Sequence, residues 1–85
     1  MQLKILYFAW VRERIGRAGE TIELTARVRT VADLIAALKS RGPEYAHAFE
    51  RADIIRAAID HVHVKHDAPI TGAREVAFFP PVTGG

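Results

Sequence analysis

The stretch Thr30-Val31-Ala32-Asp33-Leu34-Ile35-Ala36-Ala37-Leu38-Lys39 decides the fold, because it predicts the main helix of the chain. Thr30 and Asp33 have the spacing of a capping pair, in which a hydroxyl and a carboxylate bind the free amide groups at a helix start. Apolar residues follow at helical spacing, namely Val31, Leu34, Ile35 and Leu38. Gly42-Pro43 is expected to end the helix. A helix with one apolar stripe must bury it, and a small sheet offers the matching surface.

Strands are expected on both sides of this helix in the chain. Bulky and β-branched content predicts five of them, which are Leu3–Trp10, Glu20–Leu24, Ile54–Ile59, Val62–His66 and Glu75–Phe79. Val11–Gly16 is predicted to form a short helical turn, and Gly16–Gly19 would join the first two strands as a hairpin. Asp60-His61 would turn the third strand into the fourth, and Glu44–Arg51 would form a short second helix. The sequence therefore predicts an α+β fold, a mixed sheet of about five strands with both helices on one face.

Composition places the chain among small globular domains. It has 85 residues, of which 49% are hydrophobic and 26% are charged, so one domain with a modest core is expected. Cysteine is absent, which excludes a disulfide framework, a cysteine nucleophile and thiolate metal sites. A chain without disulfides suits a reducing compartment, so a cytoplasmic location is expected.

The charge balance argues against nucleic acid as a partner, and the length of the charge-free runs argues against a membrane. Twelve basic and ten acidic residues give a formal charge of +2, which is far from the dense basic stripe of a nucleic-acid-binding protein. An acidic docking partner stays open as an alternative to a merely solvated surface. Val76–Gly85 is the longest charge-free run and is too short to span a bilayer, so no membrane association is expected.

Strand alternation predicts an open apolar face on the sheet. If Lys4 points to solvent, then Leu6, Phe8 and Trp10 share its side. By the same reasoning Phe79 lies with Glu75, and His61 and His63 lie with Lys65. The face would then carry Leu6, Phe8, Phe79 and His63, and such a patch is typical of a partner surface. The alternative is that the second helix or a loop covers it.

No side-chain constellation for catalysis or metal binding emerges from the sequence. The histidines are His47, His61, His63 and His66, and no third ligand stands at a convincing spacing from the pair His61 and His63. Ser40 is the only serine and has no triad partner. Gly16 and Gly19 lack the strand and helix context of a phosphate loop.

The end of the sequence carries the functional signal. Phe78-Phe79-Pro80-Pro81-Val82-Thr83-Gly84-Gly85 has no charged side chain, and two prolines favour an extended backbone. We therefore divide the chain into a domain, residues 1–79, and a tail, residues 80–85, which can reach roughly 20 Å when extended. Glycines without a Cβ let a narrow tunnel close around the backbone, so the carboxylate of Gly85 would reach a reactive centre. The alternative is a frayed terminus.

These residues resemble a known family. The Phe78–Gly85 ending, Glu75-Val76-Ala77 before it, and the opening Leu6-Tyr7-Phe8-Ala9 with Val11-Arg12-Glu13 are similar to the MoaD-type sulfur carriers, the small subunits of molybdopterin synthase. The resemblance runs along essentially the whole chain. It implies a ubiquitin-like β-grasp fold.

The resemblance also implies a role for each part of the tail and the open face. A ubiquitin-activating-type adenylyltransferase would use ATP to adenylate Gly85, and a sulfur donor would convert it to a thiocarboxylate. The large synthase subunit would receive the tail, residues Pro80, Pro81, Val82, Thr83 and Gly84, and pass the sulfur to cyclic pyranopterin monophosphate. The partner interface would include Phe8, Leu6, Phe79, His63 and Arg12. The chain would be part of an enzyme only within that sulfurtransferase, a heterotetramer, and would bind no cofactor itself.

Two departures and several alternatives accompany the resemblance. Gly72-Ala73-Arg74 stands where the family often has Asp-Gly-Asp, which would shift the turn onto Gly72, and His63 stands where an aliphatic residue is expected. Related carriers for thiazole synthesis or tRNA thiolation share the Gly-Gly ending. A protein modifier that forms isopeptide bonds and a β-grasp binding module without covalent chemistry also stay open.

Overall fold

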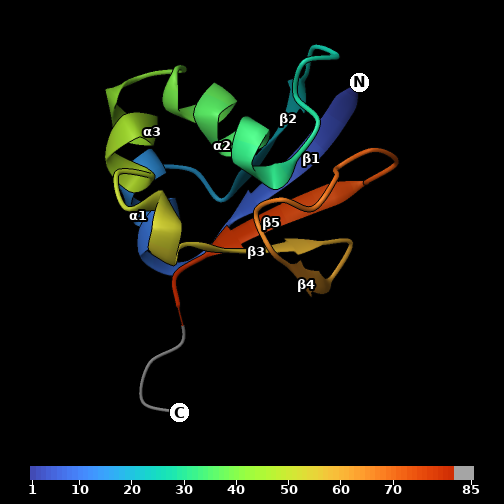
Figure 1. Ribbon diagram of the computed structural model, residues 1–85. Helices are drawn as coiled ribbons and strands as arrows, with labels where there is room; N and C mark the ends of the chain where they lie inside the picture. The colour runs from blue at the N-terminus through green and yellow to red at the C-terminus, as the bar shows by residue number, and fades with distance from the viewer. Residues whose placement is uncertain (82–85) are drawn as a thin grey trace.

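A computed structural model describes residues 1–81 of the chain (Figure 1). The chain contains helices and strands that do not alternate regularly. In chain order they are β1 (Gln2–Tyr7), α1 (Ala9–Ile15), β2 (Gly19–Glu23), α2 (Val31–Lys39), α3 (Pro43–Ala48), the 3-10 helix η1 (Ala52–Ile54), β3 (Arg56–Ile59), β4 (Val62–Val64) and β5 (Glu75–Phe79). The five strands form one sheet in the order β2-β1-β5-β3-β4. The predicted fold class is therefore confirmed.

The last strand occupies the centre of this sheet. β5 runs parallel to β1 on one side and antiparallel to β3 on the other, while β2 and β4 pair antiparallel at the two edges. A central strand has both of its backbone edges hydrogen-bonded, so its position is fixed from both sides. The point at which the chain leaves the sheet, after Phe79, is therefore well anchored.

The helices cover one side of the sheet and enclose the core (Figure 1). Val31, Leu34, Ile35 and Leu38 of α2 are buried, as the apolar stripe predicts. Phe49 follows α3 and packs edge-to-face on Phe78 of β5, with ring centroids 5.2 Å apart. Both rings are fully buried, and aromatic pairs of this geometry add stability beyond area burial.

The capping pair of the main helix forms as predicted. Thr30 accepts a hydrogen bond from the Asp33 amide at 3.1 Å, and Asp33 accepts from the Thr30 amide at 3.2 Å. The Arg29 amide also donates to Asp33, which holds the pKa of that carboxyl below its ordinary value. Pro43, predicted to end this helix, is the first residue of α3, a position that needs no amide hydrogen.

The first predicted strand is too long. Extended pairing ends at Tyr7, because Ala9 takes a positive φ of 53° and the chain enters α1. Burial of Val11 and Ile15, four residues apart, favours a helix here over a continued strand. Trp10 is therefore a helical residue beneath the Arg14 guanidinium, 4.5 Å from its ring centroid, and does not continue the strand alternation. β1 and β2 pair antiparallel as expected, and the helical turn predicted over Val11–Gly16 is present between them as α1, which begins two residues earlier.

Other boundaries also differ from prediction, and β2 begins and ends one residue earlier than the predicted segment Glu20–Leu24. The helix expected over Glu44–Arg51 ends at Ala48, since Phe49 turns into the core. The third strand begins at Arg56, because η1 takes up the start of the predicted segment Ile54–Ile59. The fourth strand stops at Val64, because the following loop turns toward α2: the Ala32 amide donates to the His66 carbonyl at 2.8 Å.

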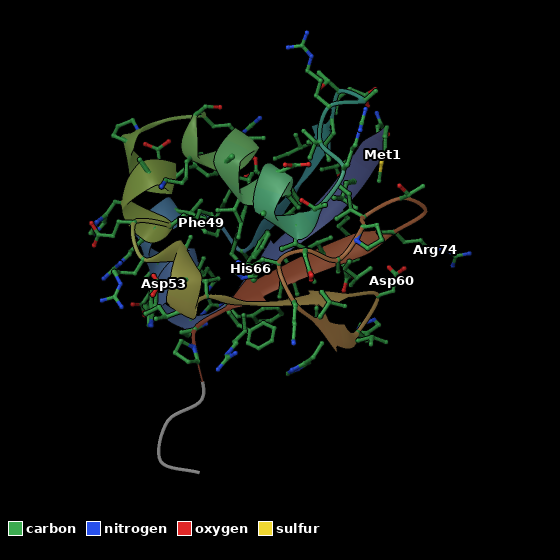
Figure 2. The ribbon with its side chains drawn as sticks, viewed as in Figure 1. Met1, Phe49, Asp53, Asp60, His66 and Arg74 are labelled. Atoms are coloured by element: carbon green, nitrogen blue, oxygen red, sulfur yellow. The ribbon has the colours of Figure 1, made fainter. Side chains whose placement is uncertain are left out.

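The turns at the far end of the sheet are built as the sequence predicts. Asp60 and His61, with φ of 47° and 72°, turn β3 into β4. The Asp60 carboxylate accepts from the Arg74 and Glu75 amides at 3.0 Å each, and Gly72 takes a positive φ of 80°. The predicted turn at Gly72 is therefore present, and its shift relative to the family stays a prediction. Figure 2 shows Asp60 and Arg74 at the end of the sheet opposite to the point where β5 stops.

Candidate functional site

The base of the tail is fixed by backbone hydrogen bonds from two neighbouring strands. The Phe8 amide donates to the Phe78 carbonyl at 3.0 Å, just beyond the end of β1. On the other side Phe79 pairs with Arg56 of β3. Pro80 and Pro81, which cannot donate to a strand ladder, follow directly, half-buried and without regular structure. The rest of the predicted tail, Val82, Thr83, Gly84 and Gly85, lies outside the described residues, so its predicted roles stay predictions.

The strand registers place most of the predicted interface on one face. Leu6 pairs with Ala77, Ala77 pairs with Ala58, and Ala58 pairs with His63, so these four residues form a row across the sheet. The neighbouring row holds Phe79 and Arg56. Directly paired residues point to the same face, which is opposite to the buried Ile5, Tyr7 and Phe78. We call the face that carries Leu6, Ala58, Ala77, Phe79, Arg56 and His63 the open face.

Phe8 and Arg12 adjoin the open face from outside the strands. Phe8 was predicted as a strand residue, but it caps α1 with an extended backbone, φ −127° and ψ 154°. Its side chain therefore lies opposite to that of buried Tyr7, and it is 45% exposed. Arg12 follows one helical turn later, since its amide donates to the Phe8 carbonyl at 3.3 Å, and its side chain is exposed. Phe8 is one of few large apolar side chains exposed in residues 1–81.

The histidines separate more than the sequence predicts. His63 alone stands on β4, and its ring centroid lies 5.1 Å from that of Phe79. The prediction that His61 shares this strand face is wrong, because His61 belongs to the turn, 3.9 Å from a Glu75 carboxylate oxygen. His66 contacts the Ile55 carbonyl at 2.7 Å through Nε2. Within residues 1–81 no three His, Asp or Glu side chains gather closely enough to hold a metal ion.

A polar cluster that joins β2 to β1 and α3 was not foreseen from the sequence. The Glu20 side chain is only 8% exposed, and it accepts hydrogen bonds from the hydroxyls of Tyr7 at 2.9 Å and Tyr45 at 2.6 Å. Arg17 and Arg41 also contact it, at 3.0 Å and 3.4 Å. The sequence does contain a sign of this cluster. Glu20 is two positions from the buried Ile22 and so points to the same face of β2, and a buried tyrosine hydroxyl such as that of Tyr7 needs a hydrogen-bond acceptor.

The cluster changes the acidity of its members. Burial alone would raise the pKa of Glu20, but the hydrogen bonds from Tyr45 and Tyr7 and the two arginine charges outweigh it and lower that pKa. Burial, with the hydrogen bond to Glu20, raises the pKa of Tyr7 and of Tyr45. Glu20 is therefore an ionised acceptor that ties β1 and α3 to β2.

Comparisons with known proteins show the family of this chain. A model of the ThiS family matches residues 5–85. The chain belongs to the ThiS family. Curated relatives of this ThiS-family protein include the "Molybdopterin synthase sulfur carrier subunit" of Escherichia coli, 40% identical over 98% of this chain and 99% of the relative. The subunit of the same name from Dictyostelium discoideum is 33% identical over 99% and 96%. The resemblance inferred from the tail and the opening strand is therefore confirmed.

Solved structures support the fold of this ThiS-family chain. A "Putative molybdopterin converting factor, subunit 1" from Pyrococcus furiosus superposes with a TM-score of 0.72 at 29% identity, covering 96% of this chain and 99% of that one. SAMP1 from Haloferax volcanii superposes with a TM-score of 0.75 at 23% identity, over 100% of both chains. Identity at that level shows the shared fold alone. No helix in residues 1–81 is long and apolar enough to cross a membrane.

Proposed function

We propose that this chain is the sulfur-carrier small subunit of molybdopterin synthase. The observation that carries the proposal is near-complete alignment, at 33% to 40% identity, with curated relatives that bear this name. The geometry supports the proposal. The central strand β5 is hydrogen-bonded on both edges, so Pro80, which follows it, has a fixed position beside the open face. A carrier protein needs a folded domain that a partner can bind and a narrow reactive terminus that can enter an active site.

The proposed chemistry takes place on the carboxylate of Gly85. A carboxylate is a poor acyl donor, since its oxygen is a poor leaving group. An adenylyltransferase of the ubiquitin-activating type would join that oxygen to the α-phosphorus of ATP and release pyrophosphate. Sulfur from a donor would then displace AMP and leave a thiocarboxylate, a soft nucleophile that is largely ionised at neutral pH in the way a thiolate is.

The partners supply the catalytic groups in this proposal. The described part of the chain offers no nucleophile with an adjacent base and no metal cluster, so acid, base and oxyanion donors would come from the enzymes that hold the tail. The large synthase subunit would take the tail and direct the sulfur to cyclic pyranopterin monophosphate. Two such transfers would complete the dithiolene of molybdopterin. The active unit would be a cytoplasmic complex of two small and two large subunits.

Intact-mass measurement tests the proposal. The purified chain is incubated with ATP, its activating enzyme and a sulfur donor, and then with the large subunit and cyclic pyranopterin monophosphate. We expect one oxygen at Gly85 to be exchanged for sulfur, and the mass to revert as molybdopterin forms. Loading without transfer, followed by sulfur delivery to a thiazole synthase or a tRNA thiolase, would assign the chain to the related carriers. Gly85 joined to lysine side chains would instead identify a protein modifier.

A further inference from the structure

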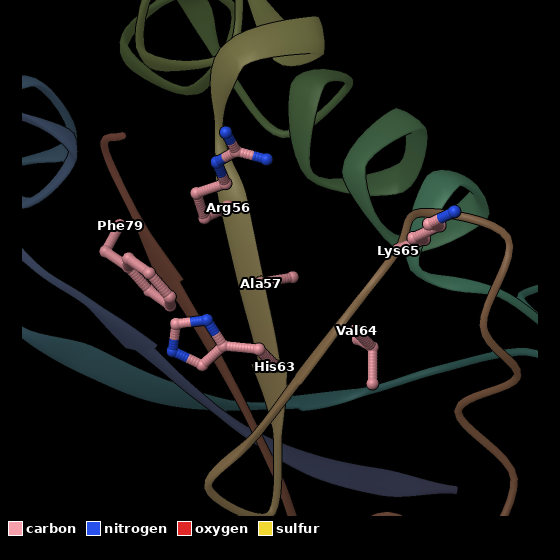
Figure 3. A pocket seen from close by; sticks show the side chains of 6 residues that line it. All are labelled: Arg56, Ala57, His63, Val64, Lys65 and Phe79. Carbon is pink, nitrogen blue, oxygen red and sulfur yellow. The ribbon is translucent and has the colours of Figure 1, made fainter. Parts of the chain in front are cut away.

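The open face ends in a hollow beside the base of the tail. It has a volume of about 380 Å³ and is lined by Arg56, Ala57, His63, Val64, Lys65 and Phe79. Figure 3 shows the His63 ring turned toward Phe79, with Arg56 and Lys65 farther along the rim. Since Phe79 directly precedes the prolines, whatever holds the tail must pass close to this hollow.

The rim of the hollow carries positive charge that the described chain does not neutralise. Arg56 is the first residue of β3 and Lys65 directly follows β4, and both side chains line the hollow. Both side chains are exposed, and neither forms an ion pair within residues 1–81. Two positive charges on the lining of one hollow repel each other in the free protein. A carboxylate bound in the hollow would offset that repulsion.

Asp53, which lines an adjoining hollow, does not neutralise these two charges. It lines that hollow with Arg56 and Lys65, but its carboxylate is bound by Arg51 at 3.3 Å and 3.4 Å. His63 adds an imidazole, which can donate a hydrogen bond to a carboxylate, and no acidic residue lines the hollow itself. The site is therefore complementary to an anion from outside the described chain.

The surroundings of the hollow favour a protein over a small anion. The rim continues into the apolar row that contains Leu6 and Ala77, and Phe8 adjoins it with 45% of its surface exposed. An apolar patch beside exposed cations is covered best by a protein with an apolar centre and an acidic edge. A free phosphate would leave the apolar part uncovered and would bind two water-exposed cations weakly.

We propose that the hollow formed by Arg56, Lys65, His63 and Phe79 receives acidic side chains of the large synthase subunit. This inference rests on the proposed function and adds the chemistry of the interface to it. The large subunit is the chosen partner because the curated relatives are named as subunits, and a lasting interface must cover the apolar face together with its charged rim. In the complex the carboxylates and the two cations lose water together, which strengthens their attraction relative to an exposed pair.

A charge-reversal experiment tests this inference. The double variant Arg56→Glu, Lys65→Glu is compared with the wild type and with Arg27→Glu, Lys39→Glu, a control that makes the same charge change at exposed positions outside the open face. Association with the large subunit is measured by stopped-flow and calorimetry at low and high salt. We expect the rim variant to lose affinity by at least an order of magnitude, chiefly through slower association, and the control to change by only a few-fold. Circular dichroism and the thermal midpoint of each variant establish that the fold is retained.

The outcomes separate the interface from the function. Wild-type affinity in the rim variant, with sulfur transfer intact, would overturn the docking inference and leave the proposed function standing. Equal losses in rim variant and control would also overturn it, because only net charge would matter. A wild type that neither binds the large subunit nor delivers sulfur to it would overturn both the docking inference and the proposed function. Saturable binding of inorganic phosphate or of an RNA oligonucleotide at the rim, with partner affinity unchanged, would reassign the hollow to that ligand.

Discussion

The backbone amide of Phe8 donates to the carbonyl of Phe78 at 3.0 Å, so an exposed aromatic ring is fixed next to the last residues of the central strand. Phe8 is also the N-cap of α1, a position where serine, threonine or aspartate normally satisfies a free amide. Its side chain makes no cap hydrogen bond. A residue that is unfavourable for local structure and exposed to water is typical of a binding site.

Replacement of Phe8 by serine should therefore separate binding from stability. The Ser hydroxyl can cap α1, so the free energy of unfolding is expected to stay the same or rise. Loss of an exposed aromatic anchor should weaken binding to the large subunit by about 1–2 kcal/mol, roughly fivefold to thirtyfold. Val62→Ser, at a side chain that is 63% exposed and lies outside the open face, is the matched control. Calorimetry with both variants makes the comparison, and equal affinities would show that Phe8 is not an anchor.

The parts of the fold that local chemistry determines were predictable from the sequence. The α2 stripe with its capping pair, and β5 with prolines directly after it, each combine a periodic pattern with a clear stop, and both match the structure. The end of β1 was not predictable in this way. The composition of residues 7–10 is that of a strand. The chain forms α1 here because the helix buries Val11 and Ile15 in the core.

Some features of the candidate site were also predictable from the sequence, and others were not. Alternation within strands placed Leu6, Phe79 and His63 on one face, because the period of two is a property of the backbone. The position of Arg56 and Lys65 on one hollow depends on the register of β3 and β4, which the length of the Asp60-His61 turn sets. The contacts of Glu20 join residues up to 25 positions apart, so they follow from the topology.

Loss of the Thr30 hydroxyl should destabilise the main helix. Thr30→Ala removes the acceptor for the Asp33 amide, and the cost is expected to be about 1 kcal/mol in the free energy of unfolding. Thr30→Ser keeps the hydroxyl and should restore most of the wild-type value. Urea unfolding of the two variants measures the difference. A Thr30→Ala protein as stable as the serine variant would mean that solvent replaces this cap at no cost.

An extra residue after Gly85 should abolish sulfur loading without affecting the fold. An appended alanine moves the terminal carboxylate beyond the atom that we propose is adenylated, so no thiocarboxylate is expected at Gly85. Thr83→Ser, which keeps both glycines, should still be loaded. Intact mass after incubation with ATP, the activating enzyme and a sulfur donor measures loading, and thermal unfolding checks the fold. Loading of the extended chain at wild-type rate would contradict the proposed chemistry.

Protonation of Glu20 should contribute to unfolding in acid. Its pKa is lowered in the folded state from an ordinary value of 4.5, so the unfolded chain takes up the proton first as the pH falls. Its contribution to stability is therefore complete above pH 4.5 and is lost as the pH falls through the lower, folded pKa. Glu20→Gln removes the charge but keeps an acceptor for Tyr7 and Tyr45, and it should cost roughly 1–3 kcal/mol at pH 7.

The pH dependence of that cost distinguishes Glu20 from the other carboxylates. Asp33 also has a lowered pKa, so the wild type and Glu20→Gln should both lose stability in acid, but the gap between them should narrow as Glu20 becomes protonated. Urea midpoints at pH 7, 5 and 3.5 measure this gap. Asp53→Asn is the control, because its carboxylate is 68% exposed beside Arg51 and its loss should change the midpoint little. A gap that stays constant from pH 7 to pH 3.5 would show that the Glu20 charge does not stabilise the fold.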